Sequence, residues 1–294
     1  MIIPCHPRNL PTLGRATASL ETAAEGFDVE CITVIDGDSR GLSWARNRGI
    51  DRATGDVVMF LDADDTVRKR FFAVFQELFE KSDCDFAISS FGFCPLKRNY
   101  DIEGNAEIRD SVARAFFGYS FDDVLRWNAG GSLDALRELG CVCRCAFKMS
   151  FLETHKIRFD ERLAVFEDSP FIAECACFAG RVSSTKEIVY EYEPADEGLM
   201  RRSMKSRVYL DYKFSALANR KAIAARSGGD VIRYFEASAV FSLLELFVKG
   251  GDWRNYLKDD FVRSSLAAFP LSVRHPLAAA AVMFMRFAAL LQRR

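Results

Sequence analysis

Strand-like and helix-like segments alternate through the first seventy residues, and this alternation constrains the fold more than any other feature. The predicted elements are strands at 1–5, 27–36 and 56–63 and helices at 10–26 and 41–54. Such alternation predicts an α/β layer structure on a mainly parallel sheet. Ligands of open α/β sheets bind beyond the carboxyl ends of the strands. Asp36 and Asp62 each follow a predicted strand, so we expect them to share a site.

Three carboxylates follow the third strand in the stretch "FLDADDTV". Asp62, Asp64 and Asp65 occupy four positions, and like charges this close destabilise one another unless a cation lies among them. The octapeptide fits two unrelated sites. One is the first motif of haloacid-dehalogenase-like phosphatases, with Asp62 as nucleophile and Asp64 as general acid beside magnesium. The other is the Asp-x-Asp motif of nucleotide-sugar glycosyltransferases, which binds ribose and a divalent metal on the donor diphosphate.

The rest of the chain favours the second interpretation. A phosphatase of that type needs a downstream lysine and an acidic pair after another strand. The nearest approach, "FEDSPF" at 166–171, opens a helix-like segment instead. The phosphatase motif also usually follows the first strand, whereas two predicted strands precede Asp62 here.

Several blocks in fixed order resemble family 2 glycosyltransferases. "MIIPCHPRNLPTL" is similar to the opening strand and loop of that family, and "ITVIDGDS" is similar to its second strand and Asp-rich turn. "GLSWARNRGIDRATGDVVMFLDADD" matches the family's run of ARN helix, strand and FLD-x-DD motif over its whole length. "FKMSFLETHKIRFDERLAVFEDSPF" resembles the segment that carries its acceptor-side "ED". The resemblance covers roughly residues 1–200.

This resemblance implies a GT-A fold over residues 1–203, followed by a helical C-terminal region at 204–294. It implies a metal-dependent, inverting transfer of a sugar, of the hexosyltransferase type, from a nucleotide-sugar, with UDP the expected nucleotide. The acceptor would be a hydroxyl of a glycan or lipid-linked glycan, as in surface polysaccharide synthesis. A catalytically silent nucleotide-sugar-binding module is the third hypothesis.

The resemblance also assigns roles to individual residues. The donor site would comprise Pro4, Asp36, Arg46, Asp62, Asp64 and Arg202. Asp64 would ligate Mn²⁺ or Mg²⁺ directly, since both metals prefer oxygen ligands, and Asp62 would contact the ribose and the metal through water. Asp168 would be the general base that takes the proton of the acceptor hydroxyl.

Structural roles compete with these assignments. Asp36 could be a plain turn residue, Arg46 a surface arginine, and Asp168 the N-cap of a helix, where Asp is favoured. The loop that holds Arg202 could close over the diphosphate or connect to the helical region. The segment after Asp36 is also shorter than the family pattern, by about one helix and one strand.

Composition sets further bounds. A formal net charge of -1 argues against a general nucleic-acid binder, which would carry a basic excess. Cys141, Cys143 and Cys145 alternate, which on a strand places them on one face. We expect them to be buried reduced thiols rather than a metal site, because zinc ligands are usually spaced by two residues or more.

The start and the end of the chain bear on location. "MIIPCHP" has no charged segment ahead of an apolar one, so no signal peptide is expected and the cytoplasm is the predicted compartment. The apolar stretch "PLAAAAVMFMRFAALLQRR" is short for a membrane span and is interrupted by Arg286. Its basic end permits docking at the inner face of the membrane, and packing on the domain is the alternative.

Overall fold

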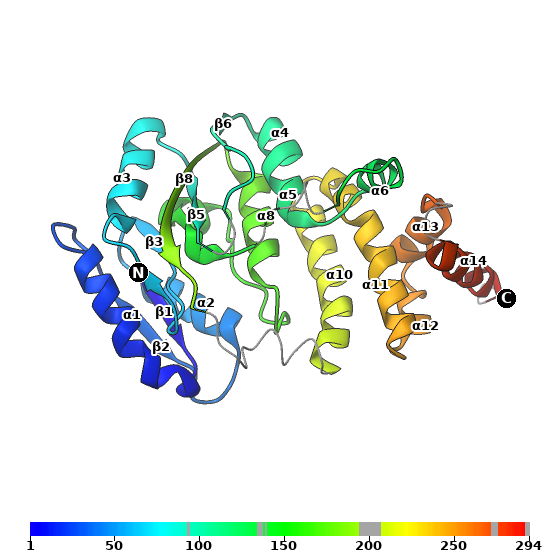
Figure 1. Cartoon of the computed structure of the whole chain (residues 1–294), viewed down its shortest axis with the longest axis horizontal. Helices are drawn as coiled ribbons and strands as arrows, with labels where there is room; N and C mark the ends of the chain where they lie inside the picture. The colour runs from blue at the N-terminus through cyan, green and yellow to red at the C-terminus, as the bar shows by residue number, and fades with distance from the viewer. Residues whose placement is uncertain (93–94, 134–137, 139, 194–206, 272–275, 292–294) are drawn as a thin grey trace. The chain divides into compact units, whose positions relative to one another are not determined.

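The computed structural model describes residues 1–92, 95–133, 138, 140–193, 207–271 and 276–291 (Figure 1). The chain forms two compact units, one of residues 1–116 with 138–202 and one of 117–137 with 203–294. The stretch 117–137 thus contributes to the helical unit. The domain boundary that the sequence places at residue 203 stays a prediction.

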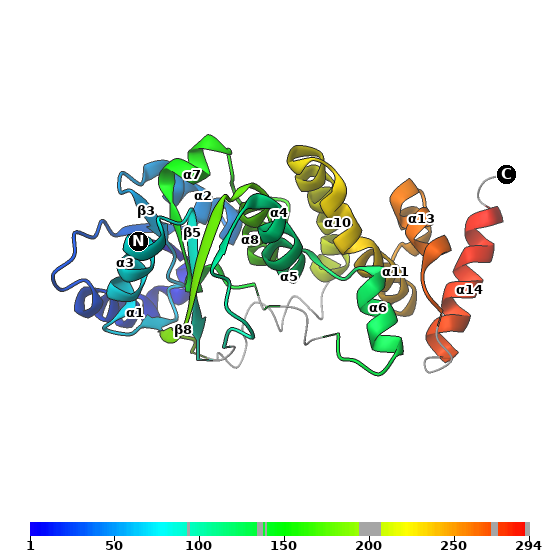
Figure 2. The same ribbon diagram turned by 90° about the horizontal axis from the view of Figure 1, so that it is seen from above.

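The first unit is the α/β unit. Its strands are β1 (Ile2–Cys5), β2 (Ile32–Ile35), β3 (Val57–Met59), β4 (Thr66–Val67), β5 (Phe86–Phe91), β6 (Ile102–Glu103), β7 (Cys145–Lys148) and β8 (Arg181–Glu191). Its main helices are α1 (Leu10–Ala23), α2 (Leu42–Arg52), α3 (Phe71–Ser82), α4 (Asn105–Ile108), α7 (Met149–Thr154) and α8 (Asp168–Phe178). Helices α1 and α3 cover one face of the sheet, and α2 and α8 cover the other (Figures 1 and 2).

The strands form a mixed sheet that is mainly parallel. Strand β1 pairs with β2 in parallel, and a parallel bridge between Ile2 and Phe60 joins this pair to the order β3-β7-β5-β8-β4. Among the described strands β7, β4 and β6 run against the others, since β7 pairs antiparallel with β3 and β5, and β4 and β6 pair antiparallel with β8. Their shared direction brings the carboxyl ends of β2 and β3 to one edge, as predicted.

Aromatic side chains fill the core next to that edge. The Phe159 and Phe171 rings stack with centroids 3.9 Å apart, and Phe60 meets both rings edge-on. Phe147 from β7 closes the group, at 5.3 Å from Phe171. Such pairs contribute beyond the area they bury, so they fix the strand end, the loop before α8 and α8 itself against one another.

The expected strand across the alternating cysteines is wrong in part. Residues Val142–Arg144 form a 3-10 turn, and β7 starts only at Cys145. Burial raises the pKa of the Cys143 and Cys145 thiols, in agreement with buried reduced cysteines. Within the described part of the chain no group of three or more His, Cys, Asp or Glu side chains could hold a metal by itself.

The second unit is helical. Its elements are α6 (Phe121–Asn128), α10 (Arg207–Ser227), a 3-10 segment at Asp230–Phe235, α11 (Glu236–Val248), α12 (Trp253–Tyr256), α13 (Asp260–Ala268) and α14 (Pro276–Leu291). No helix in the described ranges is both long and apolar enough to cross a membrane.

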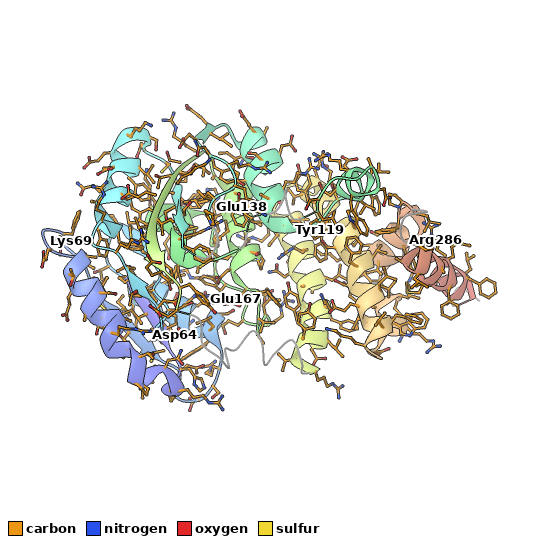
Figure 3. The ribbon with its side chains drawn as sticks, viewed as in Figure 1. Asp64, Lys69, Tyr119, Glu138, Glu167 and Arg286 are labelled. Atoms are coloured by element: carbon orange, nitrogen blue, oxygen red, sulfur yellow. The ribbon has the colours of Figure 1, made fainter. Side chains whose placement is uncertain are left out.

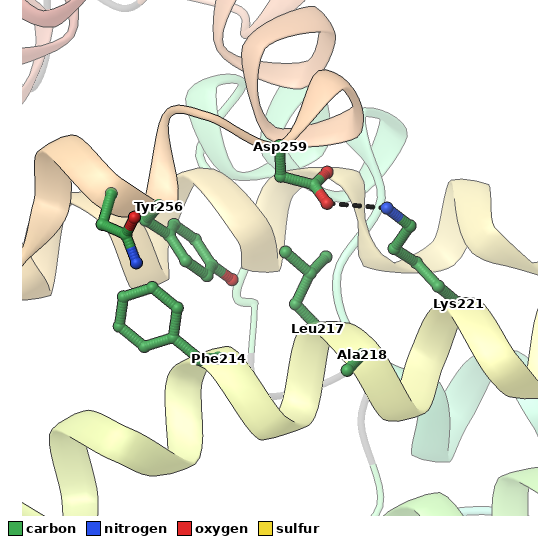
Figure 4. A pocket seen from close by; sticks show the side chains of 7 residues that line it. Phe214, Leu217, Ala218, Lys221, Tyr256 and Asp259 are labelled. Carbon is green, nitrogen blue, oxygen red and sulfur yellow. Dashed lines mark hydrogen bonds and ion pairs between the residues drawn. The ribbon is translucent and has the colours of Figure 1, made fainter.

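A pocket of about 370 Å³ opens within this unit (Figure 4). Phe214 and Tyr256 form its aromatic wall, and an ion pair of 2.6 Å between Lys221 Nζ and Asp259 Oδ2 lies at its rim. None of the sequence-predicted site residues lines it, so we assign it no part in the predicted site.

Two glycines test how tightly α2 packs on β1. A Cβ at Gly49 would collide with the side chain of Ile2, whereas a Cβ at Gly14 on α1 would meet nothing within 4 Å. We expect Gly49→Ala to lower the free energy of unfolding by about 1–3 kcal/mol through overpacking. Gly14→Ala should raise it by about 0.5–1 kcal/mol through helix propensity. Chemical denaturation of both variants checks this pair, and equal shifts would contradict the close packing of α2.

Candidate active site

Arg46 is the centre of the site. Its guanidinium is 1% exposed, and its Nη2 donates to Asp62 Oδ1 at 3.0 Å. Its Nη1 donates to Glu167 Oε1 at 2.7 Å and to Asp168 Oδ1 at 2.6 Å. One buried cation therefore joins the carboxylate at the end of β3 to the acidic pair at the start of α8. The interpretation of Arg46 as an ordinary surface arginine is wrong.

The ARN sequence explains how Arg46 is held. The next residue, Asn47, bonds the backbone of Phe159 in both directions, with its amide donating to the carbonyl and its oxygen accepting from the N–H, each at 2.9 Å. The guanidinium carbon of Arg46 lies 5.3 Å from the Phe159 ring centroid and 5.9 Å from that of Phe60. These rings form an apolar support that strengthens the charge–charge attraction of Arg46 by excluding water.

Asp36 shapes the loop that leads into α2. Its two carboxylate oxygens accept from the backbone N–H groups of Arg40 and Gly41, both at 2.8 Å. Gly41 has φ of 106°, in a region that favours glycine. Asp36 thus anchors the short connection from β2 to α2. Its contact with the donor nucleotide stays a prediction.

The three aspartates after β3 have different environments. Asp62 keeps 30% of its side chain exposed, and Arg46 occupies only its Oδ1. Asp65 is buried: it accepts from the Tyr190 hydroxyl at 2.6 Å and from the Glu193 backbone N–H at 2.9 Å. Asp65 therefore ties this loop to the end of β8, and Asp62 and Asp64 remain to face a ligand.

Asp64 is held by its backbone. Its carbonyl accepts from Arg15 Nη2 at 2.6 Å, and the neighbouring Ala63 carbonyl accepts from the Thr12 hydroxyl at 2.9 Å. Burial and the charge of Asp62 raise the pKa of the Asp64 carboxyl. Its carboxylate accepts no hydrogen bond from another residue that the structure describes. A cation is the natural partner of two such carboxylates.

The positions of Glu167 and Asp168 at the start of α8 depend on the backbone conformation around them. Phe166, just before Glu167, has φ of 59°, a left-handed conformation that a large side chain seldom adopts. On the other side Gly140 passes so close to Ser169 that a Cβ would lie 2.7 Å from its Cα. This approach lets the Val142 N–H donate to Asp168 Oδ2 at 3.1 Å.

The environment of Asp168 suits proton transfer. Burial, with the charges of Glu167 and Asp62, raises the pKa of its carboxyl to about 7, although Arg46 acts in the opposite direction. A general base works best when its pKa lies near the working pH. Asp168 also begins α8, so its N-terminal position and a role as base are compatible.

A divalent metal fits the residues present. Among the described residues Arg46 is the cation that pairs with Asp62, Glu167 and Asp168, and Asp64 adds a fourth acid at the same edge (Figure 3 labels Asp64 and Glu167). Two carboxylates are too few for a site made by the protein alone. They suit Mg²⁺ or Mn²⁺ that takes its other ligands from water and a diphosphate. Asp62 and Asp64 would be the residues that hold it.

Two predicted site residues lie elsewhere. Pro4 is buried in β1, paired with Val34 of β2, and it makes no contact with the carboxylates among the interactions described. Arg202 lies outside the described residues. The sequence missed the Tyr190 hydroxyl, which also accepts from the Asp62 N–H at 3.3 Å. The pattern "YEYE" gave no clear signal, because the same alternation would bury Tyr192, which is 45% exposed.

Part of this unit matches a known protein family. Residues 17–140 match the family glycosyl transferase family 2. This part of the chain is similar to family 2 glycosyltransferases. The match includes α2 with Arg46 and the loop with Asp62 and Asp64, and it ends before Asp168.

Two curated relatives have similar sequences. An uncharacterized glycosyltransferase, EpsJ of Bacillus subtilis, is 29% identical over 161 residues, which are 55% of this chain and 44% of that protein. The succinoglycan biosynthesis protein ExoO of Rhizobium meliloti is 25% identical over 164 residues, 55% of this chain and 45% of that protein. The chain thus spans under half the length of these relatives.

A solved structure shows the same fold. Residues 1–349 of TarS from S. aureus, in complex with UDP-GlcNAc, superpose with a TM-score of 0.57 at 16% identity, covering 92% of this chain and 80% of that one. The first unit therefore has the GT-A fold, as predicted from the sequence.

Loss of Arg46 should be costly to the fold. Arg46→Met would leave three carboxylates around a buried position without their cation, and we expect it to lower the free energy of unfolding by about 3–5 kcal/mol. Arg48→Met on the same helix removes an exposed pair with Asp51 and should change it by less than about 1 kcal/mol. Urea denaturation of both variants measures the difference. Similar values for the two would contradict the central role of Arg46.

Proposed function

We propose that the chain is an inverting, metal-dependent glycosyltransferase that moves a sugar from a UDP-sugar to an acceptor hydroxyl. The observation that carries this proposal is the ion-pair cluster of Arg46, which joins Asp62 of the donor motif to Asp168. The residue proposed to bind the donor and the residue proposed to remove the proton are thereby held at fixed positions by the same guanidinium. The family match and the UDP-GlcNAc complex of TarS support the substrate class.

The donor half of the site comprises Asp62 and Asp64. Both carboxylates would hold Mn²⁺ or Mg²⁺, which supplies charge neutralisation for the departing diphosphate. Arg46 keeps Asp62 oriented because it binds only Oδ1 and leaves Oδ2 for the ligand. Arg202 and Pro4 remain assigned to donor binding by the family resemblance, as does Asp36.

Asp168 supplies the base in the other half. Its carboxylate takes the proton of the acceptor hydroxyl as the oxygen attacks the anomeric carbon, and the nucleoside diphosphate leaves from the opposite face with its bonding electrons. Direct displacement of this kind inverts the anomeric configuration. The Val142 N–H and Arg46 fix the orientation of Asp168, and its pKa of about 7 leaves a large ionised fraction near neutral pH.

The phosphatase hypothesis is less well supported. A nucleophilic Asp62 would have to attack phosphorus, whereas Arg46 binds one of its oxygens and the family match is to transferases. The relatives named for polysaccharide synthesis support a glycan or lipid-linked glycan acceptor. We place the reaction in the cytoplasm, where nucleotide-sugars are made, and the domain boundary at residue 203.

Metal-linked donor binding is the first test. We expect Mn²⁺ together with the right member of a nucleotide-sugar panel to raise the melting temperature of the full chain, because ligand binding to the folded state stabilises it. Asp64→Ala should abolish the shift, and Asp56→Ala, an exposed aspartate ahead of β3, should keep it. Equal metal-independent shifts in wild type and Asp64→Ala would rule out the metal site.

The base gives a second test. Asp168→Asn should lower kcat by about 10²–10⁴-fold while donor binding persists. In the wild type kcat/KM should rise with pH through about 7, because Asp168 must be ionised to accept a proton, and its pKa is raised to about 7. This acidic limb should vanish in the residual activity of Asp168→Asn.

Glu167→Gln is the matched control for Asp168→Asn. Glu167 is buried beside Asp168 and bonds the same Arg46 nitrogen, so a loss through the ion-pair cluster alone would affect both variants equally. Retention of the acidic limb in Glu167→Gln is expected. Equal activity and identical pH profiles of wild type and Asp168→Asn would exclude Asp168 as the base.

A further inference from the structure

Helix α14 (Pro276–Leu291) is apolar on two opposite faces. Val282 and Met285 are fully buried against the rest of the helical unit, where α14 packs on α13 and α11. The opposite face carries large apolar side chains at helical spacing that remain exposed: Leu277 (87%), Met283 (59%), Phe284 (51%), Phe287 (62%) and Leu290 (63%). A helix that is hydrophobic all round usually has an apolar neighbour on each side. We call this second face the outer face of α14.

An aromatic and basic rim continues the outer face. The Phe284 ring lies 5.9 Å from that of Phe247 and 6.2 Å from that of Trp253. The guanidinium of Arg254, which is exposed, lies 4.6 Å from the Trp253 centroid. Asp252, the acid next to Trp253, accepts from the Asn255 N–H and caps α12. Trp253 is buried at 8% exposure, so it supports the Phe284 ring from within the unit, and Arg254 is the residue of this rim that can reach lipid headgroups.

The charge along the C-terminal segment is positive, although Arg263 pairs with Asp260 and Asp252 lies next to the rim. Residues 261–294 contain five arginines and no aspartate or glutamate, so the segment bears only positive charge. On α14 itself Arg286 is turned toward the unit, where its Nε and Nη2 donate to the carbonyls of Leu266 and Phe269 at 2.8 and 2.7 Å. The outer face is thus apolar, with basic residues in the chain segments before and after it.

We propose that the outer face of α14, together with the exposed Arg254 beside it, docks on an anionic lipid bilayer. An amphipathic surface with basic flanks binds at the headgroup level, through apolar burial together with attraction to anionic lipids. A second copy of the chain is a poorer occupant, because a two-fold contact would bring the basic flanks against each other. In the described ranges no helix is suited to cross the bilayer, so the contact is peripheral.

The biological role that we assign to this docking rests on the proposed transferase function. A chain held at a membrane meets an acceptor that is itself lipid-linked without a search through solution. The physical claim is independent of catalysis, because lipid binding can be measured without any turnover. Failure of the transferase proposal and failure of the docking proposal are therefore separate results.

Vesicle co-sedimentation of the full chain tests the docking. Vesicles of phosphatidylcholine with phosphatidylglycerol should bind the wild type, and pure phosphatidylcholine should bind it much more weakly. Phe287→Glu with Leu290→Glu should lower the partition coefficient on anionic vesicles by at least about tenfold. Arg254→Gln should lower it by roughly fivefold on anionic vesicles and leave neutral vesicles unaffected.

Leu125→Glu is the matched control, because Leu125 on α6 is also an apolar side chain of the helical unit and is 54% exposed. It should bind vesicles like the wild type. Circular dichroism and melting temperature establish that all variants are folded. Equal binding by wild type and Phe287→Glu/Leu290→Glu would overturn the proposal. A lipid-independent dimer that this double variant separates, seen by analytical ultracentrifugation, would overturn it in favour of a second copy.

Discussion

The ion-pair cluster of Arg46 organises the candidate active site of the α/β unit. Three carboxylates from distant parts of the sequence converge on one buried guanidinium: Asp62 after β3, and Glu167 and Asp168 at α8. An unpaired buried charge would be very unfavourable, so α2, the loop after β3 and the start of α8 must move together or not at all. The planar, forked guanidinium can serve partners on both of its terminal nitrogens, which a lysine could not do.

The Arg46 cluster also explains how the protein tolerates several neighbouring carboxylates when no ligand is bound. Arg46 neutralises part of the charge, and the pKa values of Asp64 and Asp168 are raised, so protonation relieves some of the remaining repulsion. A site prepared in this way still has more acids than cations. On the proposed function, a metal bound with a nucleotide diphosphate would add positive charge next to Asp62 and Asp64 and negative charge beyond them. The residual repulsion is a reason for the site to bind that pair.

Much of the fold could be predicted because local pattern and family motif agree. The strand–helix alternation of residues 1–63 depends on side-chain periodicity, which the sequence displays directly, and the GT-A fold followed from it with the motif order. The sequence could not show that Arg46 is shared by three acids, since that depends on Phe166 in a left-handed conformation and on the close approach of Gly140 to Ser169. Both are tertiary features without a local signature. The cysteine alternation misled for a similar reason, because the turn at Val142–Arg144 aims a backbone N–H at Asp168 in place of extending β7.

The two halves of the chain place opposite demands on their surfaces. In the candidate active site the charged groups are buried and need partners of opposite charge. The Asp64 carboxylate and Oδ2 of Asp62 are therefore the groups that we expect to bind a cation. On α14 apolar groups are exposed and must be covered, so every phenylalanine on the outer face points to a nonpolar environment. Carboxylates without a cation and exposed apolar side chains both lower the stability of the isolated chain. Binding of a cation to the first and of an apolar surface to the second would remove these costs. On the two proposals, a lipid-linked glycan would offer a sugar hydroxyl to Asp168 and a membrane anchor at the bilayer surface. A transferase for such an acceptor would need affinity for the bilayer as well as for the donor, and the two surfaces belong to different units of the chain, so substitutions in one need not disturb the other.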